Sequence, residues 1–441
     1  MAEFLAAGYE FGPYRLDSAG RALFRHGQVI PLPPKAVAVL LEVVRQPGLV
    51  VAKQALMNSV WPDAFVEEAN LIQMIFLLRR AFGNGAADQE YIVTLPRRGY
   101  RFAPDVRTIE VRFPLQLEAI ASRPVRPEAH SLYLKGRYFA RSLTEEAQRK
   151  AIRYFRDSIQ ADPDYAGPYA GIAECFTALA FFLGMAPKQA FSEAKPAAVK
   201  AVQLEETLGH AHAALGLLRL LDDWDWKLAE AELDRAVELG PGDAYVHWKR
   251  GMYLQYAGRF DEAVAEHRRA EQLDPFSLVA IEETGWPLYY SRRYDEAAAQ
   301  FRTAVELSPD WHMGHFGLGL VLIQQANYEG AVAELRSAAQ FAGDNAYIEA
   351  SLAYSYGRAG YCREAQHILE RLTANQAYVP NWFLSLIWVG MGKKDSGIKS
   401  LEQAFNDREP CMVALNVEPM FDPLRADARF SELVRRVGRE T

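Results

Sequence analysis

The chain has 441 residues, 50% of them hydrophobic and 24% charged, which exceeds the ~100–200 residues of a single domain. No stretch holds the ~18 apolar residues of a membrane span, and the first residues lack the features of a secretory signal. Three scattered cysteines, Cys175, Cys362 and Cys411, fit neither a disulfide framework nor metal-ligand spacing and are expected to be small buried residues on helices. A cytoplasmic protein without a membrane segment is predicted.

The formal net charge of −7 is unevenly distributed along the chain. Residues 1–112 hold 13 Lys and Arg against 11 Asp and Glu, whereas the remainder holds 36 against 45. The first part is therefore mildly basic, and the acidic excess belongs to the rest of the chain. A small basic excess is only weak support for a nucleic-acid partner.

The first hundred residues read as short strands, three helices and a final hairpin. The alternation and turn signals predict strands at Phe11 to Leu16, Ala22 to Arg25 and Gln28 to Leu32. The helical periodicity predicts helices from Pro34 to about Pro47, from Ala52 to Val60 and from Glu67 to Phe82. Two more strands, Tyr91 to Leu95 and Gly99 to Phe102, flank a basic tip at Pro96-Arg97-Arg98.

This order of elements carries four characteristic segments, LPPKAVAVLLEVV, VVAKQALMNSVWPD, ANLIQMIFLLRRAFG and YIVTLPRRGYRF. Together they resemble the winged helix-turn-helix DNA-binding domain of the OmpR/PhoB type over residues 9–104. The resemblance implies a small α+β domain at residues 1–105, with its third helix in the major groove and its wing in the adjacent minor groove. Transcription regulation is the function that it implies.

Carried over by position, the resemblance implies DNA contacts on the third helix and on the wing, from Asn70, Gln73, Arg79, Arg80, Thr94, Arg97 and Arg98. Gln73 suits an adenine edge, and Arg79 and Arg80 suit phosphate or guanine. The basic wing tip suits phosphate contacts.

The third helix also presents an unusual apolar surface. Leu71, Ile75, Leu78 and Phe82 recur at helical spacing and are expected to pack on the core. The opposite stripe then includes Ile72, Phe76 and Leu77, which relatives usually replace by polar residues. Three explanations stay open: reading by wing, phosphate and DNA shape; burial in a dimer or against the rest of the chain; or loss of DNA binding.

The segments on either side of this domain lack signals of a receiver or an anchor. Only about eight residues precede Tyr9, so no phosphorylatable receiver is expected within the chain. Residues 106–128 are too charged and too interrupted by proline for a membrane helix, and they are predicted to be a linker.

Residues 129–441 are predicted to be an all-α array. Pro241, Pro275 and Pro309 follow one another at a spacing of 34 residues, and each closes a similar pattern of small and bulky residues. The pattern resembles the tetratricopeptide repeat (TPR). The resemblance implies about eight helix pairs in a solenoid with a right-handed superhelical twist, and the last segment, from Asp427, is expected to be a capping helix.

The array offers a partner site rather than an active site. Its concave face is expected to receive a protein, a peptide or a small ligand, and five aromatic residues are either contacts or packing residues: Trp248, Trp286, Tyr289, Trp311 and Trp382. His210 and His212 lack further metal ligands nearby in the sequence, so no metal or other cofactor is expected. The aspartates around Trp224 are expected to form a solvated loop. No set of nucleophile, base and acid can be assembled.

The sequence therefore predicts a non-enzymatic transcription regulator that binds double-stranded DNA, with RNA polymerase and a second copy of the chain as further expected partners. The alternative is an interaction scaffold in which the winged helix serves assembly. A third possibility is autoinhibition, with the acidic array covering the wing.

Overall fold

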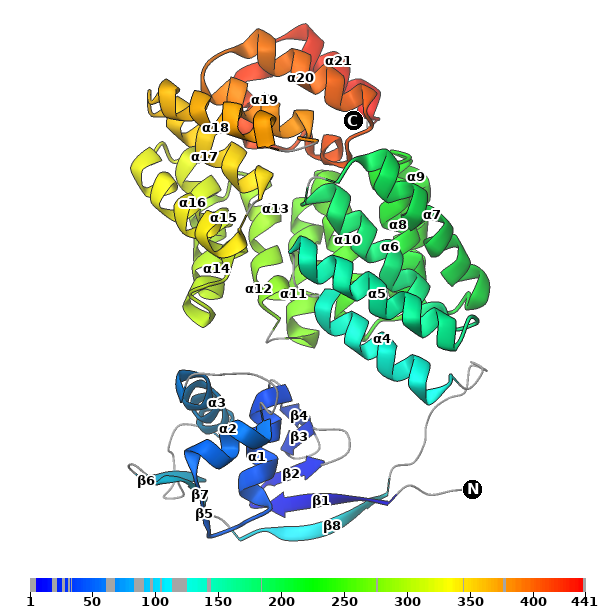
Figure 1. The fold of residues 1–441 in the computed structure, drawn as a ribbon, viewed down its shortest axis with the longest axis vertical. Helices are drawn as coiled ribbons and strands as arrows, with labels where there is room; N and C mark the ends of the chain where they lie inside the picture. Colours follow the sequence, from blue (N-terminus) through cyan, green and yellow to red (C-terminus); the bar gives the residue numbers. More distant parts are fainter. Residues whose placement is uncertain are drawn as a thin grey trace. The chain divides into compact units, whose positions relative to one another are not determined.

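The computed structural model describes residues 5–17, 22–25, 28–30, 32, 34–60, 68–82, 91–95, 98–103, 105–112, 125–140, 144–183, 185–274, 277–343, 345–375 and 378–438. The chain divides into two units, residues 1–121 and 122–441 (Figure 1). No helix among these described residues is both long and apolar enough to cross a membrane.

The first unit contains two antiparallel sheets. One sheet has the strand order β4-β3-β2-β1-β8, with β1 (Leu5–Phe11), β2 (Tyr14–Asp17), β3 (Ala22–Arg25), β4 (Gln28–Ile30) and β8 (Arg107–Arg112). The other has the order β5-β7-β6, with β5 (Val50–Val51), β6 (Ile92–Leu95) and β7 (Gly99–Phe102). The β6–β7 hairpin is the wing.

Two expectations about the strands were wrong. The predicted strand Phe11 to Leu16 is two strands, because a turn at Gly12 and Pro13, with Gly12 at a φ of +54°, reverses the chain. Residues 107–112, assigned to the linker, form β8 and pair with β1, with Tyr9 opposite Thr108. The sheet therefore extends to residue 112.

Three helices pack with residues of both sheets in one core: α1 (Pro34–Val44), α2 (Lys53–Val60) and α3 (Glu68–Ala81). The predicted apolar stripe of the third helix is confirmed, since Leu71, Ile75 and Leu78 are at most 2% exposed. These side chains join a core that includes Leu40 of α1 and Phe102 of β7. Burial of this stripe, worth about 1.5–3 kcal/mol for each large side chain, fixes which face of α3 points outward.

In the described residues the second unit is all helical and begins with eight successive helix pairs, the fifth of which has its first helix in two pieces. The pairs are α4 (Pro127–Ala140) and α5 (Glu145–Ala161), α6 (Ala166–Phe181) and α7 (Pro187–Leu204), α8 (Gly209–Leu221) and α9 (Trp226–Leu239), α10 (Ala244–Tyr256) and α11 (Phe260–Leu273), α12 (Leu278–Glu283) with α13 (Gly285–Tyr290) and α14 (Tyr294–Leu307), α15 (His312–Gln324) and α16 (Tyr328–Ala342), α17 (Ala346–Arg358) and α18 (Cys362–Asn375), and α19 (Asn381–Gly390) and α20 (Lys394–Asn406).

Glycines let the helices of the array approach closely. A Cβ atom on Gly285 would lie 2.6 Å from the ring of Phe301, and one on Gly317 would lie 2.5 Å from the same ring. Phe301 thus fills the space between its own pair and the next, as predicted from the repeat pattern. Phe155 lies in the same way between Gly136 and Gly171.

One first helix is broken where the repeat pattern suggested a continuous one. α12 ends at Glu283 and α13 begins at Gly285. Pro287 has no N–H to donate to the Glu283 carbonyl, and its ring clashes with that position in a regular helix. The break lies in the middle of the array.

The C-terminal residues do more than cap the last pair. After α20 come two 3₁₀ helices, η1 (Pro410–Ala414) and η2 (Pro419–Leu424), and then α21 (Ala428–Val437), with Asp427 as the predicted N-cap. Together, residues 408–438 are called here the closing segment. The Cys411 thiol donates to the Phe181 carbonyl over 3.5 Å, and Trp226 Nε1 donates to the Val437 carbonyl over 3.1 Å.

Further contacts join the closing segment to the later pairs. Tyr289 Oη donates to Glu418 Oε1 over 2.8 Å, and Tyr354 Oη donates to the Met420 carbonyl over 3.1 Å. The ring of Phe421 packs edge-on against Trp382, with centroids 4.8 Å apart. The array therefore closes on itself: residues near its end hold helices of the second and third pairs together with those of the fifth, seventh and eighth.

The expected solvated loop around Trp224 is corrected in part, because the tryptophan is buried at this closure while the aspartates beside it stay half-buried. Trp224 is 8% exposed and contacts Phe405 and Arg408. Asp223 pairs with Lys195, and Asp225 caps α9. The loop is ordered at Trp224 because Arg408 of the closing segment packs over the tryptophan ring.

Candidate nucleic-acid interface

The outer face of α3 combines polar and apolar side chains. Asn70, Gln73 and Arg80 are exposed on it. Ile72 and Phe76 lie on the same side of the helix and are 51% and 61% exposed, whereas Leu77 is half-buried. The face is thus suited both to hydrogen bonds with base edges and to apolar contacts with thymine methyl groups.

Arg79 lies differently from Arg80. Its guanidinium donates to the Ile92 carbonyl, over 3.1 Å from Nε and 2.7 Å from Nη2, and Nη2 also lies 2.7 Å from Thr94 Oγ1. The structure thereby brings together two of the predicted contact residues, Arg79 and Thr94, but places them against each other. Arg79 links the end of α3 to the wing, a role that sequence spacing alone does not reveal.

The wing presents Arg98 to solvent at its tip. The Arg98 N–H donates to the Leu95 carbonyl over 3.0 Å and so closes the turn, while Arg97 lies outside the described residues. Gly99 follows with a φ of +143°, and a Cβ at this position would lie 2.0 Å from the Val51 carbonyl oxygen. Only glycine allows β7 to pass this close to β5.

An aromatic cluster joins the end of α3 to the wing strands. The Phe82 ring stacks on Tyr91 with centroids 4.9 Å apart, and Phe11 meets Phe102 edge-on at 4.8 Å. Tyr14 Oη donates to the Phe82 carbonyl over 2.9 Å, which satisfies a carbonyl at the end of α3. Helix α3 and the wing are therefore held in one arrangement.

A lysine supports the helix-turn-helix from the other side. Lys35, at the start of α1, donates through Nζ to the carbonyl of Val60, the last residue of α2, over 2.6 Å. A cation at a helix C-terminus compensates its exposed carbonyls and the negative end of its dipole. The predicted Trp61-Pro62-Asp63 break after α2 lies outside the described residues.

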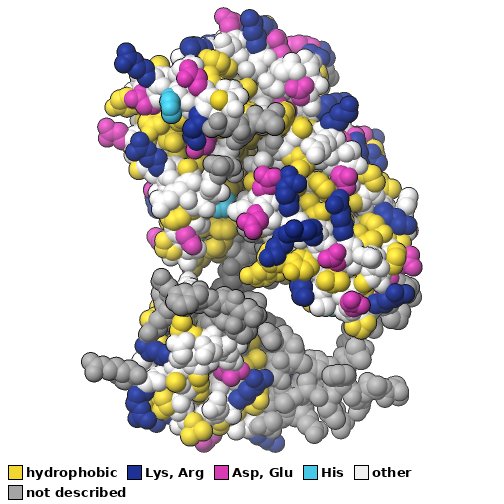
Figure 2. All heavy atoms as spheres, in the orientation of Figure 1, with side chains coloured by type: hydrophobic (Ala, Val, Ile, Leu, Met, Phe, Trp, Pro, Cys, Tyr) yellow, Lys and Arg dark blue, Asp and Glu magenta, His cyan; other side chains and the backbone are white. Residues whose placement is uncertain are grey.

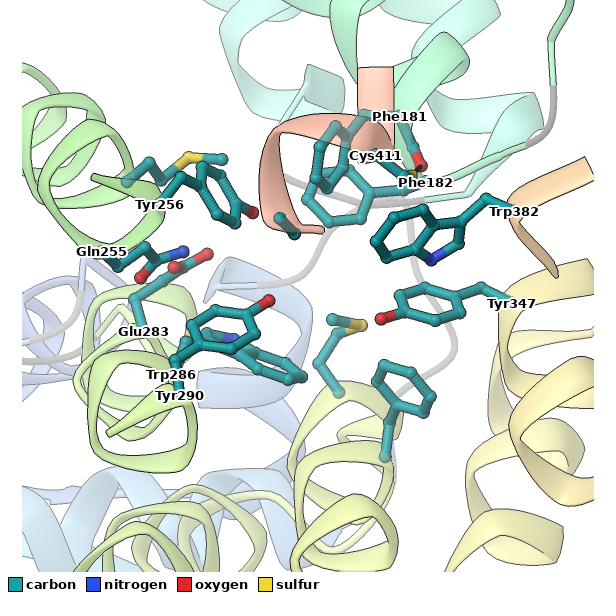
Figure 3. A pocket seen from close by; sticks show the side chains of 14 residues that line it. Phe181, Phe182, Gln255, Tyr256, Glu283, Trp286, Tyr290, Tyr347, Trp382 and Cys411 are labelled. Atoms are coloured by element: carbon teal, nitrogen blue, oxygen red, sulfur yellow. Dashed lines mark hydrogen bonds between the residues drawn. The ribbon is translucent and has the colours of Figure 1, made fainter. Parts of the chain in front are cut away.

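The aromatic residues proposed as partner contacts in the array separate into two groups. Trp286, Tyr289 and Trp382 are at most 7% exposed and pack inside the array, whereas Trp248 and Trp311 are half-buried. Figure 3 shows Cys411 of the closing segment beside Phe181 and Phe182 and facing Trp382. The burial of the first three favours packing over contact with a partner, and Trp286 and Trp382 also line the small cavity drawn in Figure 3.

Two further expectations about single residues can be compared with the structure. Cys175 and Cys411 are buried as predicted, but Cys362 is exposed because it begins α18 at the edge of its pair. His212 bonds through Nδ1 to Glu232 Oε2 over 2.6 Å and through Nε2 to the Glu206 carbonyl over 2.8 Å. His212 thus supports the contact between α8 and α9.

Charge on the array is mixed rather than basic. On the face shown in Figure 2, acidic and basic side chains are interspersed over the helices.

Comparison with known proteins assigns both parts of the chain. Residues 27–102 match the family described as "Transcriptional regulatory protein, C terminal", and residues 218–277 and 284–346 match tetratricopeptide repeats. The transcriptional regulator HilA of Salmonella typhi is 36% identical over 94 residues, which cover 21% of this chain and 17% of that protein. The transcriptional regulatory protein CutR of Streptomyces coelicolor is 34% identical over 88 residues, which cover 20% and 39%.

Among solved structures, the DNA-binding domain of Escherichia coli CadC aligns with 24% of this chain and 98% of its own, at 24% identity and a TM-score of 0.22. The chain spans well under half the length of either curated relative. The likeness to them is therefore a likeness of one domain. The chain joins an N-terminal domain of the OmpR/PhoB-type transcriptional regulatory family to a tetratricopeptide-repeat array.

Proposed function

We propose that this protein is a DNA-binding transcription regulator, in which the winged helix binds promoter DNA and the array receives a regulatory signal. The observation that carries the proposal is the outer face of α3, where Asn70, Gln73 and Arg80 are exposed on a helix fixed to the wing that carries Arg98. Double-stranded DNA, RNA polymerase and a second copy of the chain are the proposed partners. The cytoplasm, where thiols stay reduced, is the proposed location.

In the proposed complex, α3 enters the major groove and the wing lies over the minor groove. Gln73 pairs with an adenine edge, Arg80 reaches guanine or a phosphate, and Phe76 packs on a thymine methyl group. Arg98 contacts the phosphates. Arg79 acts as a positioning residue, because its hydrogen bonds to Ile92 and Thr94 hold the wing against α3.

The two neighbouring arginines give a matched test of this division. We expect Arg80→Met to weaken DNA binding about tenfold while leaving the melting temperature unchanged. Arg79→Met should instead destabilise the domain by about 1–3 kcal/mol, since it leaves the Ile92 carbonyl and Thr94 without their donor. Fluorescence anisotropy with labelled DNA and thermal unfolding of each full-length variant measure the two effects. Equal effects of both variants on both measurements would contradict the assignment.

The wing arginines are proposed to act through phosphates and not through base edges. Replacing Arg97 and Arg98 by alanine should weaken binding to every DNA sequence and should lower the slope of log affinity against log salt by about two. The measurement is a salt titration of binding to a specific and a random duplex. An unchanged slope would remove both residues from the phosphate contacts.

One observation favours the second candidate, an interaction scaffold. The exposed apolar side chains of Ile72 and Phe76 are unusual on a surface that reads DNA by hydrogen bonds. In a scaffold, this patch would contact a second copy of the chain. Sedimentation of the wild-type protein and of Phe76→Ser reports assembly, and fluorescence anisotropy with labelled DNA reports DNA binding. A scaffold binds no DNA and loses its assembly in Phe76→Ser.

A further inference from the structure

A cleft of about 330 Å³ opens between the first helices of several pairs in the array. The cleft is lined by Arg137 of α4, Glu174 of α6, Tyr245 and Trp248 of α10, and Trp311 at the start of α15. A smaller cavity of about 30 Å³ adjoins the cleft, since the two share Glu174, Tyr245 and Trp248. The cleft is large enough for a small ligand, at the lower end of the ~300–1,000 Å³ of typical sites.

One face of α10 supplies the wall of the smaller cavity. Tyr245, Trp248, Lys249 and Met252 follow at spacings of three, four and seven residues, so their side chains lie on the same side of the helix. All four line the smaller cavity. A lysine in the middle of this row is unusual, because its neighbours form an apolar and aromatic surface.

The Lys249 ammonium is buried without an oxygen partner in the described residues. Its side chain belongs to a residue that is 6% exposed, and the hydrogen bond that Nζ makes is to the Met252 thioether at 3.9 Å. Nζ lies 3.1 Å from the centre of the Trp248 ring and 5.0 Å from that of Tyr245. Aromatic faces attract a cation, but they do not replace the hydrogen bonds that an ammonium group loses on burial.

A second donor at the same place also lacks an acceptor. The hydroxyl of Tyr245, which lines both cavities, is buried with no hydrogen-bond partner among the described residues. The tyrosine ring itself is fixed by the His210 ring, which stacks on it with centroids 3.8 Å apart. Two donors without an oxygen acceptor in the described residues, Lys249 Nζ and Tyr245 Oη, therefore belong to residues that line the smaller cavity.

The carboxylates near these donors are engaged or partly neutral. Burial alone would raise the pKa of Glu174, but Arg137, whose Nη1 lies 3.2 Å from Oε2, and His210 hold this pKa down at about 2. Burial raises the pKa of Glu283 to about 7, although Lys249 opposes the shift. Burial lowers the pKa of Lys249, while the carboxylates of Glu174 and Glu283 oppose the shift.

We propose that the two cavities bind a small monocarboxylate with an apolar or aromatic body, whose carboxylate accepts hydrogen bonds from Lys249 Nζ and Tyr245 Oη. A volume of about 30 Å³ holds roughly two water molecules, which corresponds to the two oxygens of a carboxylate. The body of the ligand lies in the larger cleft between Trp248 and Trp311. The carboxylate of the ligand then meets the two donors, and its apolar body meets the two tryptophan rings.

The carboxylates in the lining of the cleft favour a ligand with a single negative charge. Asp243 and Asp274 line it, so a phosphate ester, a dicarboxylate or a nucleic acid would meet like charges there. A ligand with its charge at one end and an apolar remainder avoids this repulsion. The monocarboxylate is then the regulatory signal that the array receives. Its role as a signal rests on the proposed function, whereas its binding to the array does not.

The test uses the full chain and three probes with the same ring: phenylacetate, its neutral amide and phenethylamine. Titration calorimetry should show saturable binding of phenylacetate at one site, with the amide and the amine at least about tenfold weaker. Lys249→Met should abolish this binding and raise the melting temperature of the ligand-free protein, because it removes an unpaired buried charge. Tyr245→Phe should weaken binding several-fold.

Lys200→Met is the matched control, because Lys200 is exposed on α7 and should change neither property. The proposal is overturned if phenylacetate shows no saturable binding up to about 10 mM, if phenethylamine binds as tightly, or if Lys249→Met binds like the wild type. No DNA is present in these titrations, so their failure would leave the proposed DNA binding standing. Loss of DNA binding in the anisotropy experiment would likewise leave this site untouched.

Discussion

Phe421→Ala is expected to destabilise the array by about 3–5 kcal/mol. Phe421 is fully buried in η2, where its ring packs edge-on against Trp382 and lies 6.2 Å from the ring of Phe430. Truncation would remove the anchor of the closing segment at the eighth helix pair and leave a cavity beside Trp382 and Phe430. Urea unfolding of the full chain, followed by circular dichroism at the helix band, measures the loss.

The matched control for this substitution is Phe341→Ala. Phe341 is also a phenylalanine of the array but is 42% exposed on α16, so its truncation should cost less than about 1 kcal/mol. Hydrogen exchange adds a local measurement, since loosening of the closing segment should increase exchange in residues 410–437. Equal destabilisation by the two variants would show that the closing segment contributes little to the stability of the array.

The second large effect is expected from Gly99→Ala in the wing. The added Cβ would lie 2.0 Å from the Val51 carbonyl oxygen, at a φ of +143° that alanine rarely adopts. β7 would have to move away from β5, which breaks their pairing at Val50 and Val51. We expect a loss of about 3 kcal/mol or more from the first unit, a large part of the stability of a domain of this size.

Gly48→Ala separates the clash from the unfavourable backbone angle. Gly48 also has a positive φ, +76°, but a Cβ there would meet nothing within 4 Å, so its replacement should cost only about 1–2 kcal/mol. Hydrogen exchange of peptides covering residues 91–103 in the full chain reports the state of the wing in both variants. Similar protection in the two variants would contradict the role given to the close passage of β7.

Local patterns in the sequence were sufficient to predict those parts of the fold that depend on residues close together in the chain. The stripe of Leu71, Ile75 and Leu78 has the period of a helix, and it identified the buried face of α3 before its partners were known. The pattern of small and bulky residues before Pro275 and Pro309 likewise predicted close contacts that repeat from pair to pair. Such contacts follow from the period alone.

Contacts between distant residues were not predictable in this way. Trp226 and Val437 are 211 positions apart, and no local pattern in either segment indicates the hydrogen bond that closes the array. The hydrogen bond from Arg79 to the Ile92 carbonyl depends on how α3 packs against the wing, and the sequence does not specify this packing. β8 had a signal, the alternation of Ile109 and Val111 with polar residues, but its many charges suggested a linker.

The candidate site was predicted as a set of residues but not as an arrangement. The sequence placed Arg79 and Arg80 together as DNA contacts, whereas in the structure one is bound to the wing and the other is exposed. Lys249 gave no signal in the sequence, because a lysine on a helix is ordinarily exposed. Only the packing of α10 against the other first helices makes it a buried charge.

A mobility-shift experiment with the full chain and DNA from upstream of its own coding region tests the central claim most directly. The winged helix should retain this DNA at about 100 mM salt and release it progressively as the salt rises, and Arg80→Met should weaken the complex. A duplex of the same composition in scrambled order should bind more weakly. Absence of a salt-sensitive complex with either duplex would contradict a DNA-binding regulator and favour the scaffold.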